Sequence, residues 1–219
     1  MVKTLKTYLH STHHRRRLDQ LLGEHAHVYT GRILDIGGKD RGAFSKPRHQ
    51  VDEWVVADIV SSNNPDIVLD VCNMHMIPDA SFDVVNATEL FEHVEHPEQG
   101  LRECARVLKP GGTLIASMPF LFPIHADPTD FQRWTAFKWK KELSELEFTI
   151  DQLLPIGGFF MVAADMFKHL TRTTPRPIRW LLFLFYPLFD LLKHVDDSSR
   201  VQNGRLGAYT TGYFIVARK

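Results

Sequence analysis

Three carboxylates lie at or near the ends of successive apolar runs of this sequence: Asp35, Asp58 and Asp70. Asp35 precedes Gly37 and Gly38, and such a turn lets the backbone approach a ligand closely because glycine has no Cβ. A carboxylate at Asp58 has two acceptor oxygens and can bind both hydroxyls of a ribose. Asp70 could meet the exocyclic amine of an adenine. Acids in this order, one at each strand end, predict an adenosine-binding site.

The glycine turn does not match the fingerprint of dinucleotide-binding proteins. That fingerprint is G-x-G-x-x-G at the start of a helix whose N-terminus receives a pyrophosphate. Here the order over residues 37–42 is "GGKDRG". An acid at Asp35 also suits a ligand with an amino group better than it suits a pyrophosphate. The turn therefore disfavours an NAD-dependent oxidoreductase.

A second set of reactive side chains lies in "ELFEHVEH" and in the later loop "PFLFPIHADPTDFQRW". His93 and His125 are candidate catalytic bases because imidazole titrates near neutral pH. Glu92 and His93 follow Glu89 by three and four residues, so on a helix the three would share one face. No metal is expected, but Glu89, Glu92, His93 and His125 would suit a divalent cation and form the alternative ligand set.

Short strands must position these residues. Runs of β-forming residues lie at 32–36, 53–59, 66–71, 81–87, 112–118, 148–156 and 209–218. Several are almost continuously apolar, as in strands that are covered on both faces of a parallel sheet. Helical patterns lie between them, from Pro97 to Pro110 and over 135–146, where Thr135 is the expected N-cap. The alternation predicts a doubly wound α/β fold with its ligand at the carboxyl ends of the strands.

The composition is that of one ordinary globular chain of 219 residues. Its 26 Lys and Arg balance 26 Asp and Glu, so nucleic acid is not an expected partner and only local patches could attract anions. The basic run "HHRRR" at 13–17 is interpreted as a solvated helix face. Two cysteines, Cys72 and Cys104, and no apolar leader predict a reduced, cytoplasmic protein.

Residues 81–120, beginning "SFDVVNATELFEHVEHPEQGLRECARVLKPGG", resemble the class I S-adenosylmethionine (SAM)-dependent methyltransferases, in particular their type 11 group. The resemblance implies a Rossmann-like, seven-stranded, mostly parallel sheet with helices on both faces and an antiparallel last strand. It also implies SAM as the cofactor and S-adenosylhomocysteine as the product. Lys39 and Arg41 stand where the family has its second and third turn glycines. The cofactor-binding residues that the resemblance implies are Asp35, Gly37, Gly38, Asp58, Ile59, Asp70, Val71 and Glu89.

The expected function is methyl transfer to an oxygen of a small molecule, a sugar or a lipid-linked intermediate. One alternative is a non-catalytic binding protein with this fold, because the glycine turn is altered. Another is a metal-dependent RNA 2′-O-methyltransferase, because E-x-x-E-H with a later His resembles the metal site of the small-RNA enzymes. Phe131, Arg133 and Trp134 are candidates for lining the acceptor pocket, with a role in the core as the alternative.

Four segments are expected: an N-terminal helix (1–30), the SAM-binding core (31–160), an apolar insertion (161–207) and the last strand (208–219). The apolar run at 176–195 is too short and too interrupted to span a bilayer, which takes ~20 residues. The insertion is expected to be a lid or a homodimer surface. Its alternative role is peripheral contact with the inner face of a membrane, through an aromatic set of Trp180, Phe183, Phe185, Tyr186 and Phe189.

Overall fold

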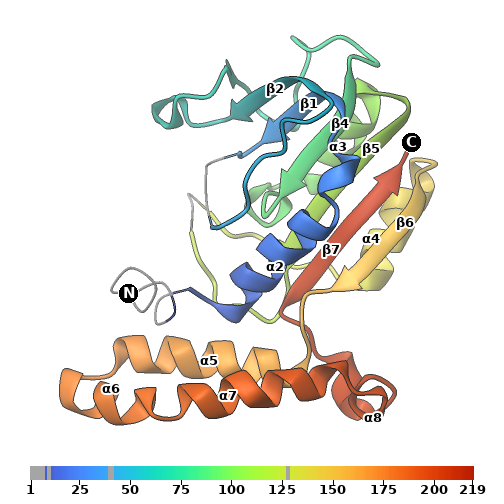
Figure 1. Ribbon diagram of the computed structural model, residues 1–219. Helices are drawn as coiled ribbons and strands as arrows, with labels where there is room; N and C mark the ends of the chain where they lie inside the picture. Colours follow the sequence, from blue (N-terminus) through green and yellow to red (C-terminus); the bar gives the residue numbers. More distant parts are fainter. Residues whose placement is uncertain (1–7, 9–10, 39–41, 127–128) are drawn as a thin grey trace.

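Seven strands form one sheet in the order β3-β2-β1-β4-β5-β7-β6 (Figure 1). The structure is a computed structural model that describes residues 8, 11–38, 42–126 and 129–219. All neighbouring strands pair in parallel except β7, which runs antiparallel to both β5 and β6. The strands are β1 (Gly31–Ile36), β2 (Val51–Asp58), β3 (Ile67–Val68), β4 (Phe82–Thr88), β5 (Leu108–Pro119), β6 (Thr149–Pro155) and β7 (Gly212–Arg218). The predicted doubly wound, mostly parallel sheet is confirmed.

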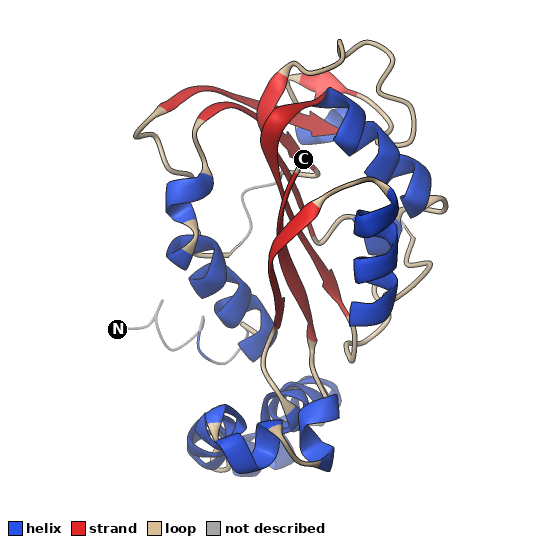
Figure 2. Ribbon diagram, turned by 90° about the vertical axis from the view of Figure 1, so that its right-hand side faces the viewer, coloured by secondary structure: helices blue, strands red, loops and turns tan. Residues whose placement is uncertain are grey.

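Helices cover both faces of the sheet (Figure 2). Helix α2 (His13–Glu24) buries Leu18 and Leu21 against one face, together with Ile33 of β1. Helices α3 (Pro97–Val107) and α4 (Ala136–Glu145) cover the other face, where they pack on Leu34. Successive residues of a strand point to opposite faces, so Ile33 and Leu34 belong to different cores. Thr135 caps α4 as predicted, since its hydroxyl accepts a hydrogen bond from the N–H of Lys138.

Two local predictions are wrong. Helix α3 ends at Val107 and not near Pro110, because Leu108 is buried and already pairs with Phe82 of β4. Glu89 has a φ of +52°, so it cannot begin a helix, and only a three-residue 3₁₀ turn, η3 (Phe91–His93), follows it. The predicted common helical face of Glu89, Glu92 and His93 therefore does not exist.

The insertion is a helical hairpin that lies beyond the carboxyl ends of the parallel strands (Figures 1 and 2). It consists of α5 (Phe159–Thr173), α6 (Arg176–Phe183), α7 (Tyr186–Leu192), η4 (Lys193–Asp197), α8 (Ser199–Gln202) and η5 (Arg205–Ala208). Phe167 of α5 packs on Phe189 of α7 with ring centroids 4.7 Å apart, and Tyr186 is buried beside them. Tyr186 therefore faces the hairpin interior, so its expected place in the membrane-contacting set is wrong.

Asp165 of α5 joins this hairpin to the N-terminus of α2. Its carboxylate accepts hydrogen bonds from the backbone N–H groups of His13 and His14, at 2.6 and 2.8 Å. Thr12 caps the same helix by accepting from the N–H of Arg15. These contacts satisfy N–H groups that a helix leaves without an internal partner. Within the described residues, no helix is long and apolar enough to cross a bilayer.

Candidate active site

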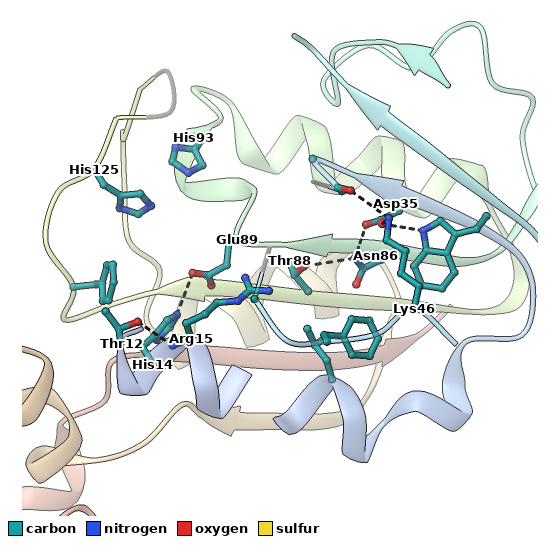
Figure 3. Close-up of a pocket in the computed structure, with 17 residues that line it drawn as sticks. Thr12, His14, Arg15, Asp35, Lys46, Asn86, Thr88, Glu89, His93 and His125 are labelled. Atoms are coloured by element: carbon teal, nitrogen blue, oxygen red, sulfur yellow. Dashed lines mark hydrogen bonds and ion pairs between the residues drawn. The ribbon is translucent and has the colours of Figure 1, made fainter. Parts of the chain in front are cut away.

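A cavity of about 320 Å³ opens where β1 and β4 end, with α2 along one side (Figure 3). Its walls come from six parts of the chain: α2, the turn after β1, the segment from Gly42 to Trp54, the end of β4, η3, and the loop after β5. The residues that line it are Thr12, His14, Arg15, Leu22, Asp35, Gly37, Gly38, Gly42, Phe44, Lys46, Trp54, Asn86, Thr88, Glu89, His93, Phe122 and His125.

The turn after β1 is built for close approach of the backbone. Gly37 has a φ of +72°, and a Cβ on Gly38 would lie only 2.4 Å from the carboxylate of Asp35. Asp35 is buried and accepts hydrogen bonds from Asn86 Nδ2 at 2.6 Å and from Trp54 Nε1 at 2.9 Å. These contacts hold its carboxylate rigidly in the cavity wall. A side chain at either glycine would disrupt the turn.

Glu89 presents a fixed carboxylate on the opposite side of the cavity. It accepts a hydrogen bond from Ser117 Oγ at 2.8 Å and lies 3.1 Å from His14 Nε2, while His14 Nδ1 contacts Thr211 Oγ1 (Figure 3). Burial by itself would raise the pKa of Glu89, but the neighbouring His14 imidazole and Ser117 hydroxyl outweigh it and lower the pKa. Glu89 is therefore a negative charge facing the cavity.

His14 was not expected here, because the run "HHRRR" was interpreted as a solvated face. That prediction is wrong for His13 and His14, which are 3 and 1% exposed. The available signal was the helical spacing: His14 lies one turn before Leu18, on the buried stripe of α2. Arg16 donates to the carbonyl of Tyr8, and Arg17 pairs with Glu24.

His93 and His125 both line the cavity, with ring centroids 5.1 Å apart. Nδ1 of His93 contacts the carbonyl oxygen of Thr129, and Nδ1 of His125 lies 3.2 Å from that of Pro123. A ring nitrogen against a carbonyl oxygen must carry a proton, so we assign the neutral rings as Nδ1–H tautomers. Each Nε2 then keeps its lone pair for accepting a proton or binding a metal.

Glu92 lies beneath these two histidines and is completely buried. Among the described residues, neither of its carboxylate oxygens has a hydrogen-bond partner, and His93 Nε2 is 3.6 Å from Oε1. Burial and the charge of Glu89 raise the pKa of Glu92 well above its ordinary value. One ligand atom from each of Glu92, His93 and His125 lies within 4.8 Å of the others. Glu89, the fourth residue of the alternative metal set, is not among this group.

The residues predicted to bind the adenosine lie next to the cavity but do not line it. Asp58 accepts from the N–H of Val60 and from Asn63 Nδ2, and Asp70 accepts from the N–H of Cys72. Asp58, the last residue of β2, lies opposite Val68, the last residue of β3, and Asp70 follows two residues later. Asp58 and Asp70 therefore do lie at the ends of neighbouring strands. Ile59 and Val71 adjoin them and are likewise absent from the lining. Lys39 and Arg41 lie outside the described residues.

The three candidates for the acceptor pocket also lie outside the cavity lining. Trp134 is 3% exposed and stacks with Phe91, so it belongs to the core. Arg133 donates two hydrogen bonds to Asp130, and Phe131 is half exposed. Lys46, Trp54, Asn86 and Phe122 were not predicted and carry no local signal in the sequence that would distinguish them.

Residues 48–116 match the family model described as "Methyltransferase domain". A SAM-dependent methyltransferase from Archaeoglobus fulgidus has the same fold, with a TM-score of 0.56 at 18% identity over 94% of each chain. The chain has the fold of the class I SAM-dependent methyltransferases. The predicted resemblance is thereby confirmed over residues 48–116 and in the fold of the whole chain. The fold also occurs in the [4+2]-cyclase SpnF, which matches this chain with a TM-score of 0.61 at 18% identity, over 93% of this chain and 80% of the other.

Curated relatives match this chain over shorter stretches. An uncharacterized 37.1 kDa protein in a transposon of Streptomyces fradiae is 27% identical over 54% of this chain and 40% of its own length. A ubiquinone biosynthesis O-methyltransferase of Xanthomonas oryzae is 54% identical over 37 residues, which are 17% of this chain and 16% of the relative. The chain thus spans less than half the length of these relatives.

The cavity fits the methionine end of SAM. That end carries a cationic ammonium, a cationic sulfonium and an anionic carboxylate. The cavity presents the carboxylates of Asp35 and Glu89 and the ammonium of Lys46, which lies 3.2 Å from Asp35. The open turn at Gly37 and Gly38 leaves room for a ligand against the backbone. Asp35, Gly37, Gly38 and Glu89 all line this cavity and could hold that end of the cofactor.

Proposed function

We propose that this methyltransferase transfers a methyl group from SAM to an oxygen atom of a small molecule, a sugar or a lipid-linked intermediate. The observation that carries the proposal is the pair of imidazoles, His93 and His125, in the same cavity as the cofactor turn. A hydroxyl acceptor loses its proton during transfer, so it needs a base beside it. The partial match to the ubiquinone biosynthesis O-methyltransferase supports an oxygen acceptor.

The chain's own residues contribute position and proton transfer. SAM supplies an electrophilic methyl group on a positively charged sulfur. Glu89 is held by Ser117 and His14, so it gives a fixed negative charge beside that end of the cavity. His93 or His125 accepts the acceptor's proton at Nε2, because Nδ1 is engaged with a carbonyl oxygen in both rings. Holding acceptor and methyl group in line can contribute ~7–11 kcal/mol to the rate.

Two measurements test this function. Methyl-labelled SAM, incubated with the protein and a metabolite or lipid extract, should give a labelled product that mass spectrometry detects. Calorimetry should show binding of SAM and S-adenosylhomocysteine, and Glu89→Gln should weaken SAM binding at least tenfold. His93→Ala and His125→Ala should keep SAM binding, and replacing the true base should reduce kcat about 10²–10⁴-fold.

His75→Ala is the matched control, because His75 is exposed and does not line the cavity. It should leave both binding and turnover unchanged. Failure of the wild-type protein to bind either nucleoside would contradict the function and favour the non-catalytic alternative. Binding of SAM with unchanged turnover in both histidine variants would show that neither histidine is the catalytic base, while the proposed methyl transfer would still stand.

A metal-assisted form of the same reaction is the second candidate, because Glu92 is a buried carboxylate without a hydrogen-bond partner among the described residues. Glu92, His93 and His125 would hold a divalent cation, and its chemistry would be to lower the pKa of an acceptor hydroxyl. The hydrogen bonds from Nδ1 to carbonyl oxygens are those that orient histidine ligands in metal sites.

Calorimetry with Mn²⁺ and with Zn²⁺ should then detect one site that Glu92→Gln weakens at least tenfold. Elemental analysis should find about one metal ion per chain, and chelation should abolish turnover. Glu145→Gln, at an exposed position of α4, is the control and should bind metal normally. Turnover that survives chelation, with no metal on elemental analysis, would rule this form out.

RNA is a less favoured candidate for the methyl acceptor. The run at 13–17 that would supply a basic patch is largely engaged inside the protein: His13 and His14 are buried, and Arg16 and Arg17 bond to other residues. A small or lipid-linked acceptor is therefore preferred.

A further inference from the structure

The hairpin of α5, α6 and α7 carries an exposed apolar stripe. Phe167, Thr171 and Tyr186 face its interior, where the hydroxyls of Thr171 and Tyr186 are 2.5 Å apart. The opposite face of α6 and α7 is apolar and open. Its members follow one another by three or four residues and are 40–74% exposed: Leu181, Leu184, Leu188, Leu191 and Val195.

Further large apolar side chains widen this stripe. Trp180 is 68% exposed, and Ile178, Phe185, Met166 and Leu170 are each at least half exposed. Together with the stripe they make up the exposed apolar side chains from α5 through η4, which we name the hairpin face. Soluble monomers rarely leave so many large apolar side chains together in water, so such a surface indicates a binding partner.

Charge at the α5–α6 end of the hairpin face is of one sign, whereas Asp190 and Asp197 lie at its other end. From residue 166 to residue 189 the sequence contains no Asp or Glu, but it contains Arg172, Arg176 and Arg179 near the turn between α5 and α6. Arg176 is exposed, and Arg179 donates to the carbonyls of Arg172 and Thr174. The partner must therefore supply negative charge around an apolar centre.

An anionic lipid surface meets these requirements better than a second copy of the chain. A two-fold dimer with the α5–α6 ends side by side would bring the same arginines of both copies together, with no carboxylate between residues 166 and 189 to separate them. Trp180 is typical of side chains that lie at the level of lipid headgroups. Helices α6 and α7 have only 8 and 7 residues, so they would lie in the plane of the surface.

We propose that the hairpin face docks this protein on an anionic membrane, with Trp180 and the leucine stripe in the headgroup region and Arg176 on lipid phosphates. Docking would bring the cavity close to the lipid, since His169 of α5 packs on Phe122, which lines the cavity. The docking does not depend on the proposed reaction, because lipid binding is measured without SAM or an acceptor.

Flotation with vesicles tests the docking. The wild-type protein should float with vesicles of phosphatidylcholine and phosphatidylglycerol but not with phosphatidylcholine alone, and high salt should reduce the floating fraction. Arg176→Gln should weaken binding about fivefold, the effect of one basic residue near the surface. A Trp180→Ser, Leu184→Ser double variant should weaken it at least tenfold.

Phe137→Ser is the matched control, because Phe137 is 84% exposed on α4, away from the hairpin. It should float like the wild type, and thermal melts should show that every variant is folded. Wild-type protein that stays in the soluble fraction, or that floats equally with neutral vesicles, would overturn the proposal. Light scattering could instead show a wild-type dimer that the Trp180→Ser, Leu184→Ser change converts to a monomer. That result would also overturn the proposal and would identify a second copy as the occupant.

Discussion

At the scale of single residues, His13 links the stability of the fold to pH. Burial, followed by the positive charges of Lys168 and Lys193, lowers the pKa of His13 from 6.5 to about 3. The folded state thus favours the neutral ring, whereas the unfolded chain binds a proton below pH 6.5. This contribution to stability is complete above pH 6.5 and is lost progressively as the pH falls from 6.5 towards 3.

We expect His13 to lower the free energy of unfolding by about 2–3 kcal/mol at pH 4 relative to pH 7. Urea denaturation at both pH values measures the difference. His13→Gln should remove that part of the pH dependence, and His27→Gln, at an exposed position, should not. An equal loss of stability between pH 7 and pH 4 in wild type and His13→Gln would show that other groups cause the acid sensitivity.

Single residues also show where sequence interpretation succeeds. Local patterns predict Asp35 and Gly37 at the end of a strand, and the family resemblance adds Glu89 to the same site; all three line the cavity. The pairing of His14 with Glu89 was not foreseen. It joins residues 75 apart in sequence, and local periodicity carries no information on such a contact.

At the scale of elements, α5 controls the position of α2. The carboxylate of Asp165 accepts the backbone N–H groups of His13 and His14, and His14 in turn contacts Glu89 in the cavity. A change in α5 should therefore alter SAM binding at the cofactor site. We expect Asp165→Ala to leave two buried N–H groups unpaired and to destabilise the protein by about 2–4 kcal/mol.

Hydrogen exchange should show faster exchange at the start of α2 in this variant, and calorimetry should show SAM binding weakened about tenfold. Asp197→Ala, at an exposed position of η4, is the control and should change neither. Unchanged exchange in α2 together with normal SAM affinity would show that the two helices are independent.

At the scale of the whole molecule, the architecture was predictable and the joining of its parts was not. Alternating apolar runs and helical patterns predict the order of strands and helices, and the stretch at 81–120 carries the family resemblance. The N-terminal helix (1–30) and the insertion (161–207) are predicted as separate segments, yet α2 and α5 meet beside the cavity. The aromatic residues of the insertion were recognised as a group, but only the three-dimensional hairpin separates the buried Tyr186 from the exposed Trp180.

The place of β7 in the sheet also affects how the chain is made. β7 lies between β5 and β6, although the whole insertion is synthesised before it. While a ribosome is translating the hairpin, β5 and β6 each have an edge with free N–H and C=O groups and no strand to pair with. The nascent protein must stay in this incomplete form until residues 212–218 have emerged, so in that interval the open edges of β5 and β6 are exposed to pairing with the wrong strand.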